Sequence, residues 1–158
     1  MSIKVKRLVN AYEERMLEFL QTCVDDSYKI HTQVSLCQFC ELDESIDWQL
    51  KKFFFSSNVD ALITNHDYKP CLVVDFQSSY HDSDEAKERD RKKATLLALA
   101  EVPLLYSRVK DFGLLHLYSQ SEEVVCNLFT GKRRENAQAL IRKYCEQSLS
   151  SNVQVTAC

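Results

Sequence analysis

Residues 60–81, DALITNHDYKPCLVVDFQSSYH, decide the fold of this chain. Residues 59–64 and 71–77 are short apolar runs rich in Val, Ile and Leu, and residues 65–70 between them supply the Asn, His, Asp and Pro that favour turns. This pattern predicts two strands that pair as an antiparallel hairpin. Both runs are apolar on both faces, which is typical of central strands covered by helices on two sides.

The hairpin is expected to bring acidic side chains together. If Asn65 faces Pro70 across the turn, Asp60 faces Asp75, and the alternation of side chains along a strand puts Gln77 on the same face. Opposed like charges destabilise a sheet unless a cation neutralises them, and oxygen ligands suit a hard cation such as Mg2+. The prediction depends on the centre of the turn, because a slip of one residue would send Asp60 to the other face.

The rest of the chain alternates between helical and strand patterns. A helix between two strands normally crosses over to make the second strand parallel to the first, so the sheet is expected to be mixed. The sequence therefore predicts an α/β fold, with a central mixed β-sheet flanked by helices on both faces. The expected helices cover residues 10–24, 44–55, 83–100 (capped by Asp82 or Ser83) and 134–148, and the further strands cover 28–36, 104–109 and 114–118, the last as an edge strand.

Length and composition point to one globular domain. The 158 residues suit a single core, expected over residues 1–149, followed by a flexible tail over 150–158. Apolar residues make up 45% and charged residues 27%, and no apolar run reaches the ~20 residues that span a bilayer, so we expect a cytoplasmic protein with no membrane contact. Seven cysteines without framework spacing indicate reduced thiols. The net charge of −3 argues against a general nucleic-acid coat but leaves room for a local basic surface.

The order of elements and the acidic hairpin together resemble the PD-(D/E)XK nuclease superfamily. Within it, the best match is a small branch of uncharacterised bacterial domains related to very-short-patch repair endonucleases. The resemblance runs over about residues 9–109. The residues that carry it are an early helical Glu13, Asp60 at the opening of a strand, the acid-x-polar pair Asp75 and Gln77 with His81, and then Arg89, Asp90 and Lys93.

The resemblance implies metal-dependent phosphodiester hydrolysis on a restriction-endonuclease-like core. It makes Asp60 and Asp75 the ligands of Mg2+, with Mn2+ as a substitute. The superfamily usually has Lys where this chain has Gln77, and Asp75 replaces the more frequent Glu. Lys93 could supply the missing cation if its helix packs over the site, and His81 could orient water or act as a base.

The resemblance also implies DNA as the substrate. Arg89 and Lys93 lie one turn apart on the basic helix, near enough to contact a phosphate backbone, although such a mixed-charge run is more often a solvated face. A small nuclease that cuts both strands would act as a homodimer. The competing hypothesis is a catalytically inactive nuclease fold that serves as a nucleic-acid-binding or protein-interaction subunit of a defence, repair or mobile-element complex. A metal or redox sensor built on the thiols is a weaker third hypothesis.

Three other features have ordinary explanations. Glu13 completes a capping box with Asn10, which explains it without a metal. Cys37 and Cys40 form a lone CxxC, for which two ordinary thiols are favoured over a zinc site. The cluster of Lys132, Arg133 and Arg134 is more often a loop and helix start than a groove contact.

Overall fold

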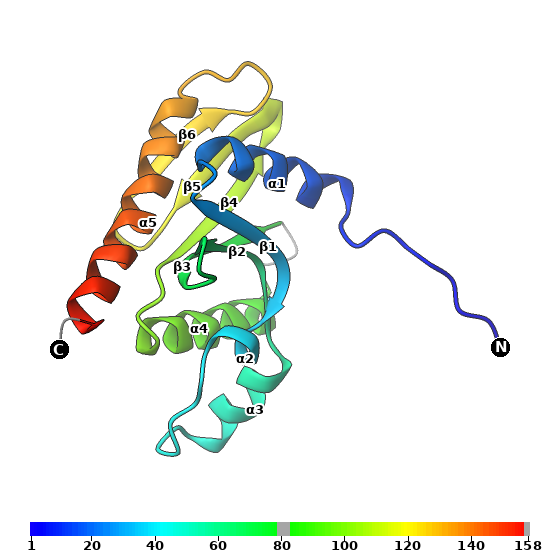
Figure 1. Cartoon of the computed structure of the whole chain (residues 1–158). Helices are drawn as coiled ribbons and strands as arrows, with labels where there is room; N and C mark the ends of the chain where they lie inside the picture. Colours follow the sequence, from blue (N-terminus) through cyan, green and yellow to red (C-terminus); the bar gives the residue numbers. More distant parts are fainter. Residues whose placement is uncertain (79–82, 157–158) are drawn as a thin grey trace.

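Six strands form one mixed sheet in chain order, in a computed structural model that describes residues 1–78 and 83–156, with side chains described to residue 148 (Figure 1). β3 and β4 run parallel, and the other neighbouring strands run antiparallel. The α/β class and the mixed sheet are therefore as predicted. The strands are β1 (Tyr28–Ser35), β2 (Asn58–Asn65), β3 (Pro70–Gln77), β4 (Leu104–Lys110), β5 (Leu114–Tyr118) and β6 (Glu123–Asn127).

Helices cover both faces of this sheet, and alternate side chains of the central strands point into two separate cores. On one face, Ile63 packs in a cluster with residues of α1 and α5. On the other face, Leu62 packs with residues of α2, α3 and α4. Figure 1 shows the two groups of helices on opposite sides of the sheet. The helices are α1 (Ala11–Cys23), α2 (Leu36–Phe39), α3 (Trp48–Ser56), α4 (Asp84–Leu99) and α5 (Arg134–Thr156).

The β2–β3 hairpin forms as predicted, but its turn does not. Pro70 pairs with Thr64 instead of Asn65, and the backbone N–H of Asn65 donates to the Lys69 carbonyl oxygen at 3.0 Å. A bulge between Ile63 and Thr64 absorbs the one-residue difference. Beyond the bulge, Ala61 pairs with Val74, which is the register that the sequence predicts for the acidic end of the hairpin.

Two helices begin at the predicted caps. Asn10 and Glu13 form the capping box of α1, and the Ser83 hydroxyl accepts the N–H of Ala86 at the start of α4. The crossover through α4 makes β4 parallel to β3, as expected. α4 packs against the β2–β3 face and brings Lys93 to Asp75.

Several boundaries differ from the predictions. α3 begins at Trp48 and not at residue 44, because the Asp47 side chain accepts the N–H of Gln49 and starts the helix there. β5 is not an edge strand, since β6 pairs along it. Neither α2 nor β6 was predicted. α5 continues to Thr156 and so includes residues 150–156, for which the sequence predicts a tail.

The helices and the cysteines bear on two of the expectations from composition. None of the helices within the described ranges has the length and apolar content needed to cross a membrane. The six cysteines up to residue 148 are free thiols, and four of them, Cys23, Cys71, Cys126 and Cys145, are buried.

Candidate functional site

Asp60 and Asp75 meet on the α4 face of the sheet, where each carboxylate accepts from a backbone N–H of the other's strand. The Asp60 N–H donates to Asp75 Oδ1 at 3.1 Å, and the Phe76 N–H donates to Asp60 Oδ2 at 2.8 Å. Each carboxylate therefore accepts a hydrogen bond from the neighbouring strand. The predicted juxtaposition of the two carboxylates is confirmed, and Asp75 is only 2% exposed.

Lys93 reaches this pair from α4. Its Nζ lies 2.9 Å from Asp75 Oδ2, and the two side chains are 16% and 3% exposed. The helix thus packs over the hairpin, which was the condition for Lys93 to serve the site. The two side chains depend on each other, because removing either one would leave an uncompensated charge out of water.

Gln33 is a member of the site that the sequence did not reveal. Its Nε2 donates to Asp60 Oδ1 at 3.2 Å. In the β1–β2 ladder Thr32 pairs with Ala61 and Val34 with Val59, so Gln33 stands beside Asp60, with its backbone in the left-handed region at φ 52°. Only the register of β1 on β2 could have identified it, and no turn fixes that register in the sequence.

The electrostatics of the cluster are unbalanced. The four carboxylate oxygens of Asp60 and Asp75 each accept one donor, but Lys93 is the single cation among those donors. Burial raises the pKa of Asp60, and the charge of Asp75 raises it further, against the opposing effects of the Phe76 N–H, Lys93 and Gln33. An additional cation would stabilise both ionised carboxylates.

The carboxyl ends of β3 and β4 continue the site. Asp75 pairs with Tyr106 and Gln77 with Arg108 across the parallel ladder. Gln77 is nearly buried, and the hydroxyl of Tyr12 donates to its backbone oxygen at 3.4 Å. Burial raises the pKa of the Tyr106 phenol, with the charges of Asp90 and Asp75 adding to the effect. Ligands of open α/β sheets commonly bind at this end of parallel strands.

The remaining predicted residues lie in different places. Arg89 is exposed on α4, one turn before the inward-facing Lys93. His81 lies outside the described residues. The Glu13 carboxylate accepts the Asn10 N–H at 3.2 Å, so its capping role accounts for it.

The third hypothesis, a metal or redox sensor built on thiols, would need several metal-binding side chains close together. Cys37 is exposed and Cys40 is half-buried at α2, where burial raises the Cys40 pKa. Across residues 1–78 and 83–156, no group of three or more His, Cys, Asp or Glu side chains is placed to hold a metal ion. A cation at Asp60 and Asp75 would therefore have two carboxylates, with water or substrate oxygens as its other ligands.

Comparison with known proteins gives one match. A family model described as "Protein of unknown function (DUF2726)" matches residues 5–121, which include Gln33, Asp60, Asp75, Gln77 and Lys93. No curated protein and no solved structure matches this chain. The chemistry of the site must therefore be argued from its own side chains.

Proposed function

This chain belongs to the DUF2726 family, and from the geometry of its own site we propose that it is a metal-dependent nuclease that hydrolyses phosphodiester bonds, with DNA as substrate. The observation that carries the proposal is the cluster of Asp60, Asp75 and Lys93 on adjoining elements. Two carboxylates and one lysine form a set that can bind a cation and an anionic substrate together. The resemblance of the sequence to the PD-(D/E)XK superfamily supports the same proposal, and the α/β fold with its mixed sheet is consistent with it.

The donor set fits Mg2+. Mg2+ in phosphoryl-transfer sites is usually held by one or two carboxylates, with water and substrate oxygens completing the shell. Asp60 and Asp75 supply the carboxylates, and a bound cation would offset the burial and the Asp75 charge that together raise the pKa of Asp60. Mn2+ would serve in its place, since it prefers the same oxygen ligands. When bound, the metal polarises the phosphate and lowers the pKa of a bound water.

The surrounding side chains have separate roles in this proposal. Lys93 offers a positive charge to the scissile phosphate while it stays paired with Asp75. Gln33 acts as a positioning residue, because its amide fixes the Asp60 carboxylate. Gln77 can orient water through its amide but cannot supply charge. In this arrangement Lys93 takes the part that the superfamily usually gives to a lysine at the position of Gln77.

DNA is the proposed substrate because exposed basic side chains of α4 border the site. Arg89 is exposed one turn before Lys93, where a phosphate next to the scissile one would pass. A homodimer would place two such sites on opposite strands.

Cleavage assays test the proposal directly. Plasmid and oligonucleotide cleavage would be measured with Mg2+ or Mn2+ for the parent protein and for Asp60→Asn, Asp75→Asn and Lys93→Met. The matched control is Asp67→Asn, an exposed acid in the turn of the same hairpin. We expect the three site variants to lose cleavage and the control to retain it. A folded parent protein that neither cleaves nor binds metal would reject the proposal.

One observation favours a second candidate, a catalytically inactive fold that serves as a binding subunit. Every carboxylate oxygen of the pair already has a donor, and Asp75 is almost fully buried, so the cluster could be a polar network that only stabilises the sheet. The candidates differ in metal binding. Calorimetric titration with Mn2+ should give a signal that Asp60→Asn abolishes if the first proposal holds, and no signal if the second does.

A further inference from the structure

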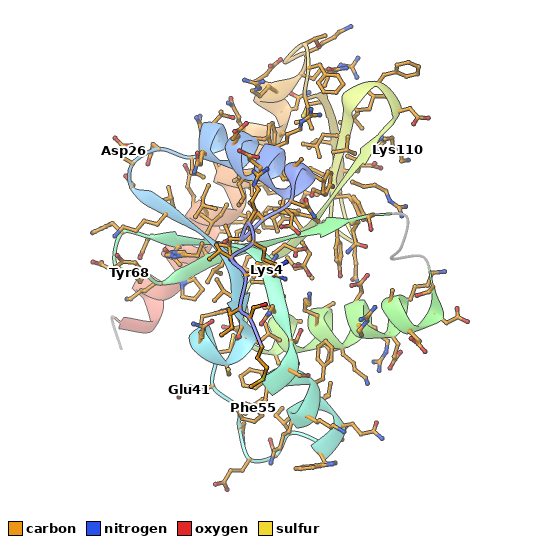
Figure 2. The ribbon with its side chains drawn as sticks, turned by 90° about the vertical axis from the view of Figure 1, so that its right-hand side faces the viewer. Lys4, Asp26, Glu41, Phe55, Tyr68 and Lys110 are labelled. Atoms are coloured by element: carbon orange, nitrogen blue, oxygen red, sulfur yellow. The ribbon has the colours of Figure 1, made fainter. Side chains whose placement is uncertain are left out.

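The end of the β4–β5 hairpin and the β6–α5 connection form one surface, which we call the hairpin-end surface. It comprises Lys110, Phe112, Phe129, Lys132 and Arg133, with Arg15 of α1 beside them. The Leu128 N–H donates to the Gly113 carbonyl oxygen at 2.9 Å, and Asn127 Nδ2 donates to the Phe112 oxygen at 3.2 Å. Figure 2 shows Lys110 at the far end of β4, where the hairpin extends away from α4.

Two aromatic rings are exposed on this surface. Phe112 is 87% exposed and Phe129 is 66% exposed. Phe112 and Arg133 both have backbones in the left-handed region, at φ 63° and 64°, which costs free energy for any residue with a side chain. Such strain persists where the surroundings impose it, and it is concentrated at functional positions. Here it holds an exposed ring and an exposed guanidinium at one end of the molecule.

Two arginines lie beside the Phe129 ring. Arg15 lies over the Phe129 ring, with its Cζ 5.8 Å from the ring centroid. Arg15 and Arg134 also line a cavity of about 500 Å3 whose walls include Phe129 and Leu128. Within the described part of the chain, the Arg134 Nε is buried without a hydrogen-bond partner. The charged residues of segments 110–112 and 129–135, taken with the cavity-lining Arg15 and Glu18, are five basic and three acidic, in a chain whose net charge is −3.

We propose that the hairpin-end surface binds a single strand of nucleic acid, with its cations on phosphates and Phe112 stacked on an unpaired base. Exposed aromatic rings among cations are the means by which proteins hold single strands. Phe and Arg are common in protein interfaces as well, but lysine is depleted there, so Lys110 and Lys132 favour a phosphate backbone over a protein partner. The inference rests on the proposed nuclease function in one respect: the same strand is taken to pass Asp60 and Asp75.

The surface lies within reach of the site. Tyr106 is paired with Asp75, and Lys110 follows four residues later on β4. At about 3.3 Å per residue, the two positions are about 13 Å apart along the strand. A single strand that passes Asp75 could therefore place a nearby phosphate at Lys110 without leaving the surface of β4.

Binding can be measured separately from cleavage. Anisotropy of a fluorescent single-stranded oligonucleotide would be recorded in EDTA with the full chain and with Phe112→Gly, Lys110→Gln and Phe55→Ala. The last is the control, an exposed ring on α3 (66% against 87% for Phe112). We expect about tenfold weaker binding for Phe112→Gly, with Tm unchanged or raised because glycine relieves the left-handed backbone. Lys110→Gln should lower the slope of log affinity against log salt by about 0.7.

The outcomes separate the two proposals. Affinities of Phe112→Gly and Lys110→Gln within twofold of the parent would overturn the hairpin-end surface, whether or not the protein cleaves DNA. Selective loss of affinity in these variants would support the surface. If that loss occurs in a protein that does not cleave with Mg2+ or Mn2+, the surface stands and the nuclease proposal fails.

Discussion

At the scale of single residues, Asp60 is a carboxylate whose surroundings favour its protonated, neutral form. Burial and the charge of Asp75 raise its pKa above the ordinary value of 3.8. Phe76 and Gln33 donate to its oxygens, and Lys93 is paired with its neighbour. Buried charges of this kind occur in binding sites and also in structural polar networks, and the nuclease proposal assigns this one to a bound cation.

This residue gives a prediction about pH. Because the folded protein binds the Asp60 proton more tightly than the unfolded chain does, the free energy of unfolding decreases as pH rises from about 3.8 through the raised folded pKa. Asp60→Asn removes that loss, and the Gln33 amide can turn so that its oxygen accepts from the new NH2 group. The variant should therefore equal or exceed the parent in stability at pH 7 while it loses cleavage.

Urea unfolding of the parent and of Asp60→Asn between pH 3 and 8 measures this. The difference in unfolding free energy should favour the variant increasingly as pH rises, and then become constant. Asp67→Asn, an exposed acid in the same hairpin, should show no such trend. A variant that is less stable than the parent at pH 7 by more than about 1 kcal/mol, the net worth of an ordinary hydrogen bond, would contradict the argument.

At the scale of elements, the β2–β3 hairpin shows what the sequence could predict. Apolar runs on both sides of a turn identified two central strands, and alternation placed Asp60 and Asp75 on one face. The bulge between Ile63 and Thr64 was invisible, since it depends on how the turn closes through Asn65. The register at the acidic end was right because that bulge offsets the error at the turn.

Elements without a local signal were missed. β6 is only five residues long, Glu123–Asn127, and its apolar character is weak without the neighbouring β5. Gln33 joined the site through the pairing of β1 with β2, which lies far from its own sequence neighbours. Lys93 was named through the resemblance on the condition that its helix packs over the site, and α4 meets that condition.

The turn between β4 and β5 gives the prediction for this scale. Gly113 has φ +75°, and a Cβ added there would lie 2.6 Å from Phe129 Cδ2. Gly113→Ala should therefore lower the free energy of unfolding by about 1–3 kcal/mol through backbone strain and steric overlap. Phe129→Ala removes the overlap but not the strain.

A double-mutant cycle separates the two causes. Urea unfolding of both single variants and of the double variant should show a favourable coupling of about 1 kcal/mol, because the second substitution makes room for the first. Strictly additive effects would mean that Phe129 moves freely and that only the left-handed backbone requires glycine.

At the scale of the whole molecule, one hydrophobic core lies on each face of the sheet. The site lies near the carboxyl ends of the parallel strands β3 and β4. α4 spans the face with the acidic pair, while the β4–β5 hairpin extends beyond it towards the hairpin-end surface (Figure 2). A nucleic-acid strand bound at both the acidic pair and the hairpin-end surface would contact α4, β3 and the β4–β5 hairpin. The proposed binding surface therefore depends on the assembled fold and could not be read from any one segment.

A cation bound at this site should stabilise the entire fold. A ligand that binds only the folded state adds RT ln(1 + [L]/Kd), so about 10 mM Mg2+ with a Kd of about 1 mM contributes about 1.4 kcal/mol, or roughly 3–6 °C in Tm for a chain of this size. Differential scanning fluorimetry with Mg2+, Mn2+ and Na+ at matched ionic strength measures the shift. We expect it for the parent and for Asp67→Asn but not for Asp60→Asn. An equal shift in Asp60→Asn would place the cation elsewhere, and a shift with Zn2+ alone that Cys37→Ser removes would favour a thiol site instead.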